Sequence, residues 1–162
     1  AGSALRELAS AVSQLVEDTQ GNVTVEKVRA YYVGVAEVSG FDIADSACAG
    51  QVSKAVASTR RALQLGTSPV ALAAALSMKV GQIARLYSTR GRINGFELAK
   101  ELGMPPFVVE KTAKVARNWS GDAVSEAVIL MADLDAAVKG QSGDPEFAIE
   151  SAVRRVAELA RR

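Results

Sequence analysis

The chain has 162 residues and a formal net charge of +1, and alanine, leucine and valine supply most of its apolar bulk while aromatic residues make up 5%. That length is sufficient to bury a core of its own. The absence of histidine excludes imidazole catalysis, and the single cysteine excludes an internal disulfide and a cysteine-built zinc site. The sequence also contains no phosphate-loop motif and no apolar stretch long enough to cross a membrane. We therefore expect a cytoplasmic protein without a cofactor or membrane contact.

The first 48 residues are predicted to form three short helices. Leucine and valine recur at helical spacing over 5–16, which indicates the first helix. Thr24 is suited to cap a second helix over 25–33, because its hydroxyl can accept a hydrogen bond from the first helical turn. Gly40 is expected to separate a third segment over 41–48.

Further helices follow with clear start and stop signals. Gly66 suits the left-handed cap of one helix, Ser68 precedes a first-turn proline, Ser120 or Asp122 can open a helix, and Asp144 precedes another proline. The predicted helices are 51–65, 69–87, 96–102, 106–119, 122–139 and 145–160. No strand pattern is found, so the expected fold is all α. The residues expected to form its core are Leu76, Ile83, Met131, Leu134, Val153 and Val156.

Charge is distributed unevenly along the chain. Residues 1–50 contain three basic and seven acidic side chains, 51–120 contain eleven and three, and 121–162 contain five and eight. The middle block is therefore strongly basic, which suits contact with nucleic acid or with an acidic partner. Helix faces exposed to solvent are the more common explanation of such a block.

The most specific local pattern is a helix, a turn and a second helix around Gly103. Ala99, Gly103 and Val109 have the spacing of the small, turn and branched residues of a helix-turn-helix. Three basic residues that could contact DNA or a partner follow at three-residue steps along the second helix: Lys111, Lys114 and Arg117. Two more, Arg90 and Arg92, precede the helix pair in a loop. One interpretation is therefore a DNA-binding regulator with a recognition helix at 106–118.

A structural helix pair is the competing interpretation of the same pattern. The first two turns of the second helix contain no Asn or Gln to read adenine. Their early exposed positions are instead predicted to be Pro105, Pro106 and Glu110, which are poor base readers. These residues favour a structural role over sequence-specific DNA recognition.

Other candidate residues indicate structure more than chemistry. Asp133 and Asp135 would point about 200° apart on one helix, which prevents them from sharing a metal. Asp135 and Lys139 have the spacing of a surface ion pair. Cys48 is best interpreted as a small buried hydrophobe, and Trp119 as an anchor in the core or an interface.

Four segments in a fixed order resemble one family. The segments are Val38–Asp45 joined to the helix start at Gly66–Leu76, then Leu98–Lys111, Ala116–Ser120 and Ala132–Gly140. Together they resemble the C-terminal domain of the bacterial DNA polymerase III delta subunit, a clamp-loader component, and the resemblance extends over residues 4–160. Tyr31-Tyr32 before the first segment looks actinobacterial.

The resemblance implies a protein of AAA+-like architecture without a working nucleotide site. Residues 1–48 would be the C-terminal part of a small helical, lid-like domain, and residues 49–162 a helical collar domain. Ala1-Gly2-Ser3 would be a cloning remnant or a cut edge. The family's clamp-opening element belongs to an N-terminal domain outside this chain, so no clamp-binding residue is carried over.

The implied function is subunit assembly during loading of the sliding clamp onto primed DNA, without catalysis by this chain. The implied partners are the tau/gamma-type and delta-prime-type clamp-loader subunits, with the sliding clamp contacted only through the N-terminal domain. DNA would be bound weakly and without sequence preference. The alternatives are the helix-turn-helix regulator and an uncatalogued helical interaction domain.

Overall fold

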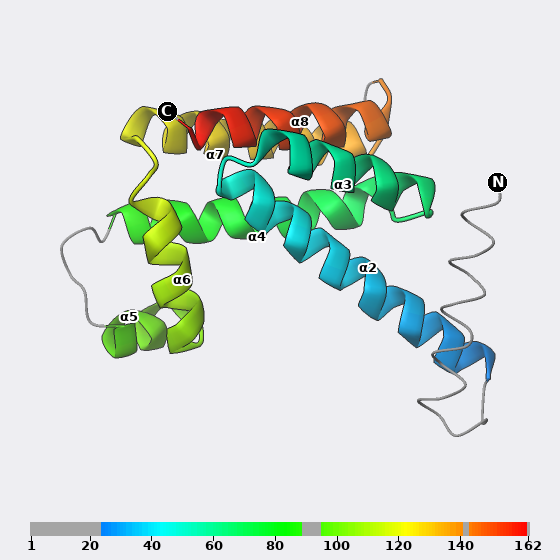
Figure 1. The fold of residues 1–162 in the computed structure, drawn as a ribbon, viewed down its shortest axis with the longest axis horizontal. Coiled ribbons are helices and arrows are strands. Elements are labelled where there is room, and N and C mark those ends of the chain that lie inside the picture. Colours follow the sequence, from blue (N-terminus) through cyan, green and yellow to red (C-terminus); the bar gives the residue numbers. More distant parts are fainter. Residues whose placement is uncertain (1–23, 89–94, 141–142, 162) are drawn as a thin grey trace.

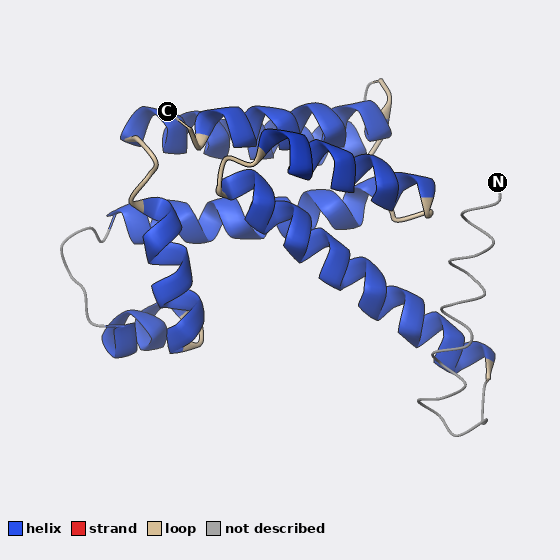
Figure 2. Cartoon of the chain, viewed as in Figure 1, coloured by secondary structure: helices blue, strands red, loops and turns tan. Residues whose placement is uncertain are grey.

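The computed structural model describes residues 24–88, 95–140 and 143–161, and within these ranges the regular structure is entirely helical (Figure 2). The helices are α2 Val25–Cys48, α3 Val52–Gln64, α4 Pro69–Ser88, α5 Gly95–Leu102, α6 Pro106–Ala116, α7 Gly121–Val138 and α8 Pro145–Leu159 (Figure 1). The predicted all-α fold is confirmed. The predicted helix over 5–16 lies outside the described residues.

α2 is one continuous helix of 24 residues, where the sequence predicted two short ones. Thr24 caps it as expected, because its Oγ1 accepts a hydrogen bond from the backbone N–H of Lys27 at 3.2 Å. Gly40 was wrongly predicted to interrupt the helix. It is buried where α2 crosses α4, and a Cβ at this position would lie 3.1 Å from the Cβ of Ala75. A larger residue would crowd this crossing, which accounts for a glycine here although glycine costs about 1 kcal/mol in a helix interior.

The later helices begin and end close to the predicted residues because their caps form. Gly66 adopts a φ of +89° after α3, and the Ser68 Oγ accepts from the backbone N–H two residues later at 3.2 Å. Ser120, rather than Asp122, caps α7, with its Oγ 3.1 Å from the N–H three residues later. Asp144 caps α8 because its Oδ1 accepts a hydrogen bond from the backbone N–H of Glu146, the second residue of the helix, at 3.0 Å. These are local signals, and each satisfies backbone groups that a helix end leaves free.

The core lies around α4, which contacts α2, α6, α7 and α8. α8 lies against α3 and α7 on the other side of this core (Figure 1). All six residues predicted to form the core are buried: Leu76, Ile83, Met131, Leu134, Val153 and Val156. The apolar stripes of α4, α7 and α8 therefore meet in one core, as their spacing predicted.

α5 and α6 form a short helical pair at one end of α4 (Figure 1). α6 packs on α4 with Val109 and Thr112 buried, and α5 packs against α6. This arrangement leaves the opposite face of α6 exposed to solvent. It also brings α6 close to the C-terminal end of α2, which positions the side chains described next.

Candidate interaction surface

The basic residues predicted from the sequence divide into two groups. Lys111, Lys114 and Arg117 lie exposed on α6 or at its C-terminal cap. Arg90 and Arg92 lie outside the described residues. Within the described part of the chain, neither Lys114 nor Arg117 has an ion-pair partner, whereas Lys111 does. The charge that α6 can offer to a phosphate or an acidic partner therefore comes mainly from Lys114 and Arg117.

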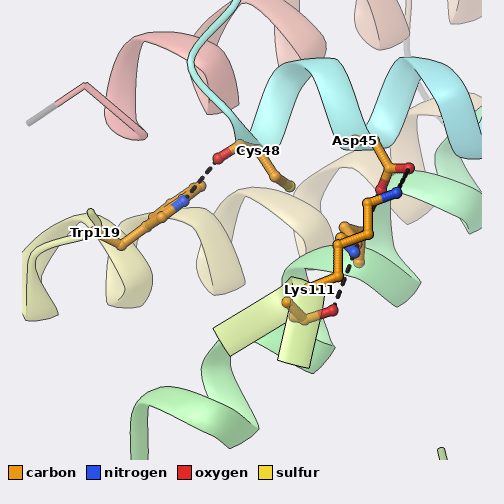
Figure 3. Close-up of polar contacts among 6 residues, drawn as sticks. Asp45, Cys48, Lys111 and Trp119 are labelled. Carbon is orange, nitrogen blue, oxygen red and sulfur yellow. Dashed lines mark hydrogen bonds and ion pairs between the residues drawn. The ribbon is translucent and has the colours of Figure 1, made fainter. Parts of the chain in front are cut away.

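Lys111 belongs to a polar cluster that joins three helices (Figure 3). The Asp45 carboxylate of α2 lies 3.3 Å from the Nζ of Lys79 on α4, and also 3.3 Å from the Nζ of Lys111 on α6. Lys79 Nζ donates in addition to the Oγ1 of the buried Thr112 at 3.1 Å. One carboxylate thus pairs with two ammonium groups and connects α2 to both α4 and α6.

A second connection joins α2 to the segment after α6. The indole Nε1 of Trp119 donates to the backbone carbonyl of Cys48 at 2.9 Å (Figure 3). That carbonyl is in the last turn of α2, where the helix itself supplies no donor. Trp119 is 2% exposed, so the prediction that it is a core anchor is confirmed.

The only cysteine is unsuited to chemistry. Cys48 is buried, as predicted, and burial raises the pKa of its thiol to about 12. The nearby Lys79 lowers this pKa and the nearby Asp45 raises it, but both effects are smaller than that of burial. The thiol is therefore protonated at neutral pH and is a poor nucleophile.

The helix pair itself offers little for reading DNA bases. α6 begins at Pro106 and ends at Ala116, short of the predicted 119. Phe107 and Glu110 are exposed in its first turns, and an apolar ring and a carboxylate are ill suited to a phosphate backbone. Nothing in the described residues favours a recognition helix over a helix that braces α4.

Acidic residues lie on the outer side of α7. Asp135 pairs with Lys139 at 2.9 Å, which confirms the predicted surface ion pair. Among the described residues, no group of three or more Cys, Asp or Glu side chains could hold a metal ion. No described helix is both long and apolar enough to cross a membrane.

Several large apolar side chains remain on the surface. They are Val25, Phe41, Leu65, Val70, Met78, Phe107, Val128, Ile129 and Phe147. α2 and α4 each contribute two of them at separated positions, whereas Val128 and Ile129 are consecutive residues of α7. Helical spacing predicts that Val128 belongs to the same apolar stripe as Val124 and Met131, and its 46% exposure shows that this prediction is wrong. A helix that is apolar on two sides gives no periodicity that distinguishes its buried face from its exposed one.

Comparison with known proteins gives a consistent result. Residues 37–156 match the family model described as the DNA polymerase III delta subunit, C-terminal domain. A solved structure, the Bacillus subtilis DNA clamp loader delta protein, has a TM-score of 0.68 and 16% identity to this chain. The match covers 92% of this chain and 45% of that protein, so this chain spans less than half its length, and the likeness is one of fold. No curated protein matches the sequence.

Proposed function

The chain belongs to the family formed by the C-terminal domains of DNA polymerase III delta subunits, and from that membership we propose that it assembles a clamp loader by binding other loader subunits. The observation that carries the proposal is the family match over 37–156, which extends from the second half of α2 into α8. The match thus includes the helices that form the core. The proposed role is to hold subunits together while the sliding clamp is loaded onto primed DNA.

We propose a division of the chain at the end of α2. Residues 49–162 would form the helical collar, and residues 1–48 the C-terminal part of a lid-like domain. Ile43, Ala44 and Ala47 of α2 are buried in the same core as α4 and α8, which supports a firm attachment between the two parts. The last turns of α2 would therefore transmit the position of the lid-like domain to the collar.

We infer that the chain has no catalytic activity of its own. The sequence has no histidine and no phosphate-binding loop, and the Cys48 thiol is buried and protonated. Its contribution to a polymerase holoenzyme would be structural, through tau/gamma-type and delta-prime-type subunits. Calorimetric titration with Mg-ATP should give no saturable heat, and a micromolar isotherm would contradict this inference.

The assembly role is testable with purified proteins. The chain should co-elute with at least one loader subunit of the same organism during size-exclusion chromatography, with a mass by light scattering equal to the sum of the partners. An unrelated helical protein of similar size serves as the control for nonspecific association. Separate elution from every loader subunit, alone and mixed, would contradict the proposed function.

For DNA we propose weak, sequence-independent contact through Lys114 and Arg117. Two exposed cations beside Lys111, which is already paired with Asp45, support phosphate contact more than base recognition. Fluorescence anisotropy on random and primed duplexes should show binding that falls steeply with salt and disappears when Lys111, Lys114 and Arg117 are all changed to Ala. Nanomolar binding to one sequence at physiological salt would instead support the helix-turn-helix regulator.

A further inference from the structure

α7 has apolar residues on two sides. Its inner side contributes Val124, Ala127, Met131, Leu134 and Val138 to the core. On the outer side, Val128 is 46% exposed and Ile129 is 65% exposed. Ser125 and Ala132 are also exposed. Their spacing of three, four and seven residues places these four side chains on one face of the helix, which we name the α7 outer face.

Such a face is unusual for a helix at the protein surface. A surface helix commonly has one apolar stripe facing the core and polar residues opposite. A single exposed apolar residue needs no explanation, but Val128 and Ile129 are adjacent and are framed by the small residues Ser125 and Ala132. Large side chains beside small ones form the ridges and grooves into which another helix packs.

The charges that α7 itself contributes are all negative. α7 has four acidic residues and no basic residue between 121 and 138. Glu126 is paired with Arg155 of α8 at 2.6 Å, and Asp135 with a lysine after the helix. Within the described ranges, Asp122 and Asp133 have no ion-pair partner. They lie before and after Ile129 along the helix, so a carboxylate is available at each end of the apolar pair.

We propose that the α7 outer face binds a helix of another clamp-loader subunit, and that this helix has branched apolar side chains bordered by Lys or Arg. The inference rests on the proposed function and names the surface through which it is exercised. The apolar pair would supply buried contact at the centre, and Asp122 and Asp133 would pair with the partner's cations at the rim. Charge complementarity of this kind sets the orientation and the choice of partner.

The test compares two substitutions that each replace an exposed apolar side chain with Asp, at different positions. Ile129→Asp places a charge at the centre of the α7 outer face, and Phe147→Asp places one on α8 at a side chain that is 70% exposed. When the full 162-residue chain is tested, Ile129→Asp should raise the dissociation constant for the loader subunit at least tenfold, because apolar residues at the centre of an interface carry most of the binding energy. Phe147→Asp should change the dissociation constant less than about twofold, as expected away from an interface centre.

Charge reversal and cross-linking provide two independent measurements. Asp133→Lys should weaken the complex at low salt, and the difference from the unmodified chain should shrink as salt screens the pair. A photo-reactive residue in place of Ile129 should form a covalent cross-link to the same loader protein. This readout does not depend on loss of affinity, and it keeps the proposal testable if Ile129→Asp fails to fold by circular dichroism.

Each other outcome overturns the proposal in a distinguishable way. A folded Ile129→Asp chain that binds as tightly as the unmodified chain would refute the α7 outer face and leave the proposed function intact. An unmodified chain that binds no loader subunit would refute the proposed function and this inference with it. Concentration-dependent self-association that Ile129→Asp abolishes would assign the face to a second copy of the chain instead.

Discussion

Replacing Trp119 with Phe tests how the segment after α6 is held to α2. The substitution keeps an aromatic ring but removes the Nε1–H that donates to the Cys48 carbonyl at 2.9 Å. A buried acceptor left without its donor costs about 1–3 kcal/mol. The smaller ring leaves a cavity that adds about 1 kcal/mol. We therefore expect Trp119→Phe to lower the free energy of unfolding by about 2–4 kcal/mol.

The assay is urea denaturation followed by circular dichroism at the helix band, because Trp119 is the only tryptophan and its fluorescence is lost in the variant. The control is Phe147→Leu, a conservative change of an exposed ring that should alter the free energy of unfolding by less than about 0.5 kcal/mol. A Trp119→Phe chain that matches this control would refute the reasoning, since the hydrogen bond would then contribute nothing measurable.

Three further predictions concern the core, the polar cluster and the buried thiol. Leu134→Ala should lower the free energy of unfolding by about 2–5 kcal/mol in urea titration, because the side chain is buried in the core. Lys79→Ala should lower the free energy of unfolding more than Lys111→Ala in the same assay, because the Lys79 side chain is only 11% exposed. The Lys111 side chain is exposed, and an exposed ion pair contributes about 0–1 kcal/mol. Equal effects of the two substitutions would contradict the assigned geometry. The Cys48 pKa is raised from its ordinary value of 9.0 to about 12, so the thiol ionises first in the unfolded chain and the free energy of unfolding should fall between pH 9 and 12. Cys48→Ala should fall less steeply over the same range in urea titrations at each pH, and identical slopes would contradict the assignment.

Most helix ends were predictable because their signals are local. Ser120 and Asp144 lie within three residues of the N–H groups that they accept from, and Gly66 supplies the left-handed conformation directly after α3. The burial of Met131 and Leu134 followed from helical spacing alone. Such features depend on short stretches of sequence, which periodicity and capping rules describe well.

The features that failed or were missed depend on residues far apart in the chain. Gly40 was expected to end a helix, and its real role at a close crossing depends on Ala75 of another helix. The candidate site shows the same limit, because exposure of Lys111 on α6 was foreseeable but its pairing with Asp45 of α2 was not. No spacing rule relates residues 66 positions apart.

The most direct test of the central claim is a competition during clamp-loader assembly. Labelled full-length delta subunit of the same organism is mixed with the other loader subunits, and increasing amounts of this chain are added before the assembled loader is isolated. We predict that the chain enters the complex and displaces the labelled subunit in proportion to its concentration, while Ile129→Asp does so only at much higher concentration. Full retention of the labelled subunit at a large excess of the unmodified chain would contradict the proposal that this chain assembles the loader.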